Sequence, residues 1–432
     1  SQLEDILIFH KGYYNSSIVS LTIGQTNMCT IYELLYRLSR LKYLFLNEVY
    51  DMETSEIRWL SPSTNFKSQL LHFKFHTQQI KFNQFKALLK IVREKLRYLS
   101  FSYTNLLSSQ NSDTAYVNVR QWEQLLMSIP NLSHFDLFLN ILYRNDEIDL
   151  TAVETQFPAN SWKKFNVVVT TPSPSYKTRL YQKKNEQILS IYTLPYPKSE
   201  LYLTATAGTL VNTNGGGYHK VQKLIIDTLS MASLDRDQPP NHPPFYPHVD
   251  SVTLCYDQRT SEATAADFSR LFNLWNLKYL TITNNSISAN ELLTAIVEQA
   301  PRLCSLKFEG NGQLMSKIVE NSTLRTFFQN QISTLNLLYD NSLIDLTTEG
   351  IIGTFSNLKK FYFCVDSSED FYLIVPYVLR ILKKLYYLYV EIYHDDFGRE
   401  QQDVYKRLKK NVRNGREFQL ERLSTRTVQI WL

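Results

Sequence analysis

Few residues of this chain combine the types and spacings that chemistry requires. Three histidines, His219, His242 and His248, fall in a segment rich in proline and glycine. No helix is expected there to fix metal geometry, and no acidic or cysteine partner stands at a ligand spacing. The NGGGY stretch that begins at Asn214 lacks the lysine and the serine of a phosphate-binding loop. The sequence therefore indicates neither a metal nor any other cofactor.

Nucleophilic chemistry is equally poorly represented. The chain contains no GxSxG element. Its four cysteines, which form no CxxC pair, are Cys29, Cys255, Cys304 and Cys364. Scattered single thiols are typical of proteins in reducing compartments, although four N-x-S/T sequons, the first at Asn15, point the other way. We therefore predict a non-enzymatic protein located inside the cell, in the cytoplasm or the nucleus.

A repeat dominates the second half of the chain. Blocks of the form LxxLxL begin at Val249, Leu277, Leu303, Ile332, Leu358 and Leu385, at successive steps of 28, 26, 29, 26 and 27 residues. This period is typical of leucine-rich repeats, in which each unit supplies one strand and one helix or helical turn. Looser blocks begin at Ile18, Leu41, Leu70, Leu96 and Leu132, and weaker ones at Trp162, Lys198 and Val221.

Each block has apolar residues at positions one, four and six, and positions four and six fit a strand with one buried face. Between blocks, apolar residues recur three and four apart, as in ANELLTAIVEQA (289–300), where Asn290 is the expected N-cap. One face of that expected helix carries Leu292, Leu293, Ile296 and Val297. Parallel strands joined by helices predict an α/β leucine-rich-repeat solenoid, or horseshoe, with a parallel concave sheet and helices on the convex side.

The ninth position of each block should lie where the chain turns away from the sheet. A short polar side chain there can satisfy backbone groups buried in the turn. In the C-terminal blocks this position is occupied by Asp257, Asn285, Asn311, Asp340 and Asp366, and only the last block departs, with Tyr393.

The middle of the chain interrupts the repeat. Seven of the fourteen prolines fall between Pro195 and Pro247, and proline removes a ladder donor and fixes a backbone angle. We therefore divide the chain into N-terminal repeats (1–170), irregular repeats with enlarged loops rich in proline and glycine (171–248), regular repeats (249–393) and a basic cap (394–432). The alternative is two shorter arcs that meet near residue 240.

Basic side chains gather in YKRLKKNVRNGRE near the C-terminus. The six cations are Lys406, Arg407, Lys409, Lys410, Arg413 and Arg416. One interpretation is a basic patch for RNA or another anionic surface. The other is a terminal helix that buries Val404, Leu408 and Val412 and caps the last repeat. We favour the cap, because the net charge of +5 is modest for 432 residues and does not by itself indicate a nucleic-acid partner.

Strand alternation sends positions three, five and seven of each block to the concave face. In the N-terminal repeats these positions hold Tyr43, Phe45, His72, Lys74, His76 and Tyr98. In the C-terminal repeats they hold Tyr279, Lys307, Glu309, Tyr362, Tyr387, Tyr389 and Glu391. Tyrosine provides a large contact area at little cost in entropy, so we interpret these residues as a surface for a protein partner. The alternative for Tyr362, Tyr387 and Tyr389 is stacking that stabilises the sheet.

Units such as LKYLTITNNSIS (277–288) resemble the leucine-rich-repeat superfamily. The stretches VRQWEQLLMSIPNLSHFDL (119–137) and SIYTLPYPKSEL (190–201) are similar to F-box leucine-rich-repeat proteins. In that family an F-box docks a ubiquitin-ligase core, and the repeats select the substrate. The resemblance implies a substrate receptor, with the ligase core as a partner only if an F-box lies upstream of Ser1, since no F-box signature is visible in this sequence.

Two further functions remain open from the residues alone. The first is a scaffold or inhibitor solenoid without a ligase role. The second is nucleic-acid binding through the basic C-terminal helix, which would weaken steeply with salt. No apolar run is long enough to span a bilayer, so we expect no membrane partner.

Overall fold

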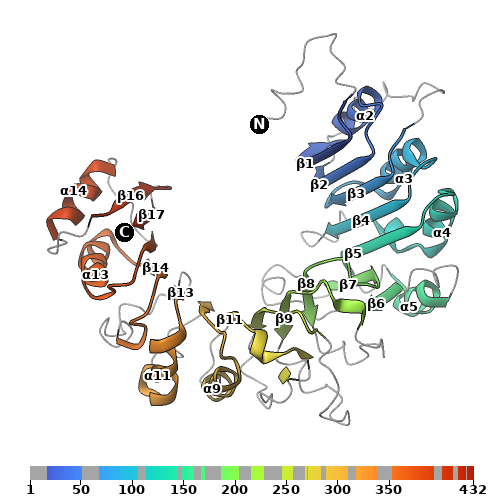
Figure 1. Cartoon of the computed structure of the whole chain (residues 1–432). Coiled ribbons are helices and arrows are strands. Elements are labelled where there is room, and N and C mark those ends of the chain that lie inside the picture. The colour runs from blue at the N-terminus through green and yellow to red at the C-terminus, as the bar shows by residue number, and fades with distance from the viewer. Residues whose placement is uncertain are drawn as a thin grey trace. The chain divides into compact units, whose positions relative to one another are not determined.

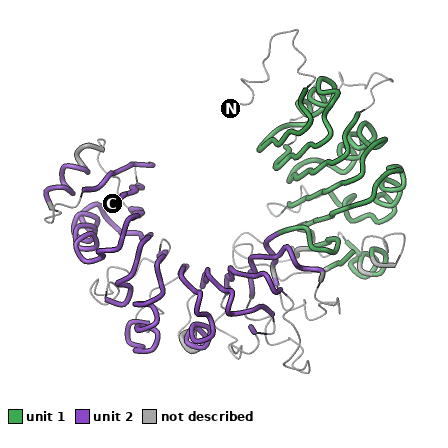
Figure 2. The backbone as a smooth tube through the Cα atoms, in the orientation of Figure 1, with its two compact units in different colours: residues 1–198 green, residues 199–432 purple. Residues whose placement is uncertain are grey.

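The computed structural model describes sixteen segments of the chain: residues 17–50, 68–105, 113–144, 148–159, 167–170, 186–203, 216–227, 246–255, 268–269, 271–283, 289–309, 318–337, 353–393, 401–411, 417–424 and 426–432. The chain divides into two units, unit 1 (Ser1–Lys198) and unit 2 (Ser199–Leu432), and each contains a sheet of its own (Figure 2). The fold is α/β, with two mostly parallel sheets. The single concave sheet expected from the repeats is thus present as two sheets.

Unit 1 begins with five strands that pair in parallel and in chain order. They are β1 (Ser20–Asn27), β2 (Tyr43–Tyr50), β3 (His72–Thr77), β4 (Tyr98–Asn105) and β5 (His134–Arg144). The helices between and after them are α2 (Met28–Arg37), α3 (Phe82–Val92), the short η3 (Thr114–Val117), α4 (Val119–Met127) and α5 (Leu150–Ala159). Figure 1 shows α2, α3 and α4 on one side of the strands, as expected for crossover connections.

The strands pair in the register that the repeat predicts. Position three of one block lies beside position three of the next, so His72 pairs with Tyr43 on one side and with Tyr98 on the other. In β3, Phe73 and Phe75 at positions four and six are fully buried, whereas Lys74 between them is exposed. We call the sheet face that carries positions three, five and seven the odd face, and the face that carries positions four and six the even face.

Backbone hydrogen bonds tie successive blocks together just before each strand. The carbonyl of Val19, at position two, accepts from the amides of Lys42 (2.8 Å) and Tyr43 (3.1 Å), at positions two and three of the next block. The same double acceptance recurs at the carbonyls of Lys42, Leu71, Arg97, Ser199, Gln222, Asp250, Lys278, Cys304, Ser333 and Lys359. This repetition fixes the register independently of the apolar residues.

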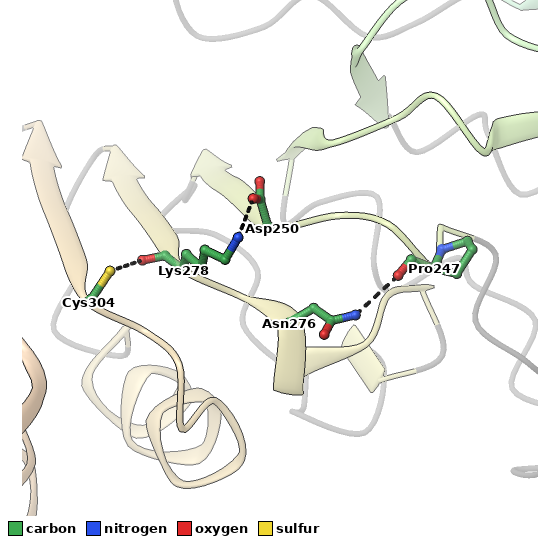
Figure 3. Close-up of polar contacts among 5 residues, drawn as sticks. All are labelled: Pro247, Asp250, Asn276, Lys278 and Cys304. Atoms are coloured by element: carbon green, nitrogen blue, oxygen red, sulfur yellow. Dashed lines mark hydrogen bonds and ion pairs between the residues drawn. The ribbon is translucent and has the colours of Figure 1, made fainter.

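Side chains reinforce this junction in unit 2 (Figure 3). The Lys278 ammonium lies 3.2 Å from a carboxylate oxygen of Asp250, and Cys304 Sγ donates to the Lys278 carbonyl at 3.7 Å. Just before this strand, the Asn276 amide donates to the Pro247 carbonyl at 3.3 Å. Polar groups of successive repeats therefore form hydrogen bonds and ion pairs with one another near the N-terminal ends of the strands.

The parallel series of unit 1 stops at β5. Strand β7 (Glu186–Thr193) pairs antiparallel with β5, and β6 (Val167–Thr170) pairs antiparallel with β7. The block at Trp162 was expected to give another parallel strand. Its residues 162–166 lie outside the described part of the chain, and the strand described from Val167 onward pairs antiparallel, so the expected parallel pairing is wrong. Because β7 occupies the free edge of β5, no further parallel repeat can pair there.

Unit 2 contains eight parallel strands in chain order. They are β8 (Glu200–Leu203), β9 (Lys223–Asp227), β10 (Ser251–Cys255), β11 (Tyr279–Thr283), β12 (Ser305–Glu309), β13 (Thr334–Leu337), β14 (Lys360–Val365) and β15 (Tyr387–Ile392). Between them lie η6 (Gly216–Tyr218), η7 (Leu274–Asn276), α9 (Ala289–Gln299), α11 (Ser322–Gln331) and α13 (Ser368–Ile381). The weak blocks at Lys198 and Val221 are confirmed as β8 and β9, in register with β10.

Helix α9 has the apolar face that the sequence predicted, but it begins at a different residue from the predicted one. The four residues predicted to share that face, Leu292, Leu293, Ile296 and Val297, are all buried. The helix begins at Ala289, so Asn290 lies inside its first turn and is not the N-cap. Side-chain caps do occur elsewhere, as at Asn321, whose Oδ1 accepts from the amides of Thr323 and Leu324 at the start of α11.

The C-terminal cap differs from the expected one. Helix α14 (Gln401–Asn411) does bury Val404 and Leu408, and it packs against α13. The edge of the sheet, however, is covered by strand β17 (Thr427–Trp431), which pairs antiparallel with β15 and with β16 (Gln419–Arg422). The last repeat is therefore capped by two returning strands, and the basic helix covers another helix.

The turn after β3 uses a polar side chain one position earlier than the sequence predicted. Thr77, at position eight, is fully buried, and its hydroxyl donates to the Val49 carbonyl (2.7 Å) and accepts from the amides of Gln79 (3.2 Å) and Ile80 (3.1 Å). The ninth residue, Gln78, is only partly buried. Of the five polar ninth residues predicted in the C-terminal blocks, Asp366 alone lies within the described residues.

Replacement of this hydroxyl should therefore be costly. We expect Thr77→Val to lower the free energy of unfolding by about 1–3 kcal/mol, because the change keeps the shape but leaves a buried carbonyl and two amides without their partner. Urea unfolding of the variant and of the wild type measures the loss. Thr22→Val, at an exposed odd position of β1, is the matched control and should change stability by less than about 0.5 kcal/mol. Equal losses in the two variants would contradict the assigned role.

Candidate interaction surface

The odd face of unit 1 carries a continuous row of rings across four strands. Tyr43, His72, Tyr98 and His134 occupy position three of successive blocks, and their ring centroids are 4.8, 5.5 and 6.4 Å apart. All four side chains are partly or fully exposed. The sequence predicted the first three of them. The parallel register brings them together, because equivalent positions on neighbouring strands lie side by side.

A strong hydrogen bond fixes one ring of this row. The Tyr98 hydroxyl donates to a carboxylate oxygen of Asp136 at 2.5 Å. Burial, followed by this hydrogen bond and the carboxylate charge, raises the pKa of Tyr98 well above its usual value, so the phenol stays protonated. Asp136 stands at position five of its block. The sequence rule could have found it, although it was not among the predicted site residues.

Three basic side chains gather beside this row: Lys74, His76 and Lys198. Nδ1 of His76 lies 3.0 Å from the Ser102 hydroxyl. Burial, with the charge of Lys198 as the second cause, lowers the pKa of His76 to about 4. Burial lowers the pKa of Lys198 to about 8, with the charge of Lys74 as the second cause. His76 is therefore neutral at physiological pH, whereas Lys198 carries only part of a positive charge.

Part of this odd face is already covered by the chain itself. Tyr196 is 2 % exposed and its ring lies edge-on to Phe138, with the centroids 6.0 Å apart. The Lys198 ammonium lies 5.2 Å from the centroid of the same Phe138 ring. Ser102, which pairs with Phe138 across the strands, is only 6 % exposed. The accessible part of the odd face therefore includes Tyr43, Phe45, His72 and Lys74 on β2 and β3.

In unit 2, two predicted site residues neutralise each other. The Lys307 ammonium lies 2.7 Å from a carboxylate oxygen of Glu309, two residues along the same strand and on the same face. Tyr279, at position three of the neighbouring strand, is 48 % exposed. This part of the odd face is thus open but carries little net charge.

The tyrosine cluster forms as the sequence predicted. The Tyr362 ring centroid lies 5.4 Å from that of Tyr387 and 5.8 Å from that of Tyr389. Trp431 of β17 adds a fourth ring, with its centroid 4.5 Å from that of Tyr387, a contact that the sequence did not indicate. Tyr387 is 7 % exposed, so stacking accounts for its position, whereas Tyr362 and Tyr389 are partly exposed and remain available for contact.

Carboxylates create a negative potential around this cluster. Burial raises the pKa of the Cys364 thiol to about 12, and the charges of Glu391 and Asp366 contribute to that rise. Burial also raises the pKa of Tyr387 to about 12, assisted by the neighbouring tyrosines and by Glu421. Carboxylates therefore lie near both groups, although burial is the first cause of each shift.

The basic patch is partly engaged in packing. Arg407 lies 4.0 Å from the centroid of the Tyr372 ring in α13, and Lys409 lies 5.6 Å from that of Tyr405. Lys406 and Lys410 are exposed, while Arg413 and Arg416 lie outside the described residues. The stacking of Arg407 on Tyr372 uses one cation of this helix in its packing against α13.

No protein-family model matches the chain. No curated protein matches it either. Within the described segments, no three histidine, cysteine, aspartate or glutamate side chains are grouped so that they could hold a metal ion. No helix among the described residues is long and apolar enough to cross a membrane.

The site residues that the sequence missed fall into two classes. Asp136, Phe138 and His134 obey the same positional rule as the predicted residues, so the rule could have identified them. Tyr196 and Trp431 come from segments that fold back onto the odd face or beside its last strand, and no periodic signal marks them. Lys198 is the first residue of a weak block, and the positional rule did not assign it to the odd face.

Proposed function

We propose that this chain is a non-enzymatic protein-interaction module of the leucine-rich-repeat class, a horseshoe-shaped solenoid that holds a protein partner on the odd face of its sheets. We propose further that it is the substrate-receptor part of an F-box-type ubiquitin-ligase adaptor, acting in the cytoplasm or nucleus. The observation that carries the proposal is the row formed by Tyr43, His72, Tyr98 and His134, in which partly exposed rings are held in register across four strands.

The physical support is preorganisation. Each ring projects from a strand whose even face is buried in the core, so the rings are already ordered before a partner arrives. Binding to such a surface loses less side-chain entropy than binding to mobile side chains. Aromatic side chains with polar tips are the residues that most often dominate the energy of protein interfaces.

The first test removes two exposed rings from this row. We expect the double variant Tyr43→Ser, His72→Ser to bind the partner recovered by affinity capture at least about tenfold more weakly than the wild type, because interface hot spots contribute about 2 kcal/mol or more each. The melting temperature should change little, since both rings are partly exposed. The quantity measured is the dissociation constant of the purified partner.

The control is Tyr36→Ser, which removes an exposed tyrosine from α2 and leaves the odd face intact. Unchanged affinity in the double variant would refute the placement of the partner on this face. The ligase role has a separate readout, which is whether ubiquitination of the captured partner in cells depends on this protein.

A further inference from the structure

The last strands of unit 2 place an aromatic grid on the odd face. Pairing puts Tyr362, Tyr389, Gln429 and Glu421 side by side on β14, β15, β17 and β16. The adjacent row, two residues earlier on β14 and β15, runs through Lys360, Tyr387, Trp431 and Gln419. Four of these eight side chains are aromatic, and they are neighbours.

The rings of this grid are inclined to one another. The interplanar angle is 53° between Tyr362 and Tyr387, 37° between Tyr362 and Tyr389, and 63° between Tyr387 and Trp431. Tyr362 and Tyr389 are partly exposed and Trp431 is 43 % exposed, so these three rings contribute electron-rich surface to the odd face. Such faces attract a cation that lies within about 6 Å of the ring centroid.

The charges around the rings have the matching sign. Glu391 follows Tyr389 by two residues on the same face, and Glu421 lies beside Gln429 in the row of Tyr389. Asp366 follows the end of β14. The one lysine of the grid, Lys360, has its ammonium 5.8 Å from the ring centroid of Tyr386, which precedes β15. Burial is the main cause of the raised pKa values of Cys364 and Tyr387, and the charges of Glu391 and Asp366 near Cys364 and of Glu421 near Tyr387 add to it.

We propose that this odd face of β14, β15 and β17 binds a cationic side chain, an arginine or a lysine, of a protein partner, with Tyr362, Tyr389 and Trp431 providing ring faces and Glu391 and Glu421 providing the counter-charges. The inference rests on the proposed function and narrows it, since it assigns a basic segment to the partner at this end of the sheet. Buried Tyr387 serves as the support that holds Trp431 and Tyr362 in place.

Two synthetic peptides test the chemistry directly. Both are glycine–serine chains of equal length, one with two arginines and the other with two citrullines, which keep the shape of arginine without its charge. We expect the full chain to bind the arginine peptide at least about tenfold more tightly than the citrulline peptide, as measured by calorimetry. Binding of the arginine peptide should weaken with added salt, because the counter-charges are partly exposed.

Single substitutions locate the site. Tyr389→Leu should lower the affinity for the arginine peptide by about tenfold. Tyr389→Phe, which keeps the ring, should have an affinity within about threefold of that of the wild type. Glu391→Gln should weaken binding by about threefold. The matched control is Tyr36→Leu, which removes an exposed tyrosine from α2, away from the odd face, and should leave the affinity unchanged.

Equal binding of the two peptides, or a dissociation constant weaker than about 1 mM for the arginine peptide, would overturn this inference. So would an effect of Tyr36→Leu as large as that of Tyr389→Leu. None of these results would contradict the proposed function. That proposal is tested on the other sheet, by partner capture through Tyr43 and His72, and does not require a cationic side chain on the partner.

Discussion

Trp122→Ala is expected to cost this protein about 3–5 kcal/mol of unfolding free energy. Trp122 in α4 is 0 % exposed, and its ring centroid lies 5.1 Å from that of Phe82 and 5.5 Å from that of Phe101. Its Nε1 donates to the carbonyl of Tyr116 at 2.8 Å. Removal of the side chain would leave a cavity among rigid rings and a buried acceptor without its donor.

Chemical denaturation and hydrogen exchange together measure this effect. The midpoint of urea unfolding should fall, and amides of β4 and α4 should lose protection first, because they surround the cavity. Trp275→Ala serves as the control, since Trp275 is 58 % exposed and its removal should change stability by less than about 1 kcal/mol. A similar loss of unfolding free energy in both variants would show that Trp122 does not have a special role in stabilising the aromatic core of unit 1.

The second large effect concerns His76 and acid. The pKa of His76 is about 4 in the folded protein because of burial first and the charge of Lys198 second, and in the unfolded chain it returns to the ordinary value of 6.5. At pH values between about 4 and 6.5, His76 binds a proton in the unfolded state but not in the folded state. Stability is therefore fully present above about pH 6.5 and falls as the pH drops toward the folded pKa. Between about pH 7.5 and pH 5 the loss should be about 2 kcal/mol.

His76→Gln isolates this contribution, because glutamine can keep a hydrogen bond to Ser102 but does not titrate. The variant should lose about 2 kcal/mol less than the wild type over the same pH interval in urea unfolding. Thr22→Val provides the control, since it changes an exposed odd position of β1 and removes no titratable group. A wild-type slope that survives in His76→Gln would exclude His76 as its source.

The repeat itself was predictable because one physical rule governs many residues. A block with positions four and six in the core directs positions three and five to the opposite face, and parallel pairing aligns equal positions. Tyr43, His72 and Tyr98 could therefore be placed together from sequence alone. The rule even recovered the weak strand at Lys198, since aligned hydrogen bonds tolerate imperfect apolar patterns. In this chain, the regular spacing of the blocks therefore predicts strand position and register better than the identity of single residues does.

What could not be predicted depends on strands outside the repeat. β7 has alternating apolar residues like any strand, and nothing in EQILSIYT indicates that it returns antiparallel along β5. The same is true of TVQIW at the C-terminus, which brings Trp431 to Tyr387. Pairing direction is decided by the path of the connecting chain, which local patterns do not encode.

Strand β17 also limits how this architecture can grow. Duplication of a repeat adds a parallel strand easily wherever the neighbouring edge is free, so lengthening by copying is the natural route for such proteins. Once a returning strand lies against β15, a new unit inserted at that point would have to displace it, together with the tryptophan that it carries. Gene duplication can therefore change the number of units upstream of β15 far more readily than beyond it.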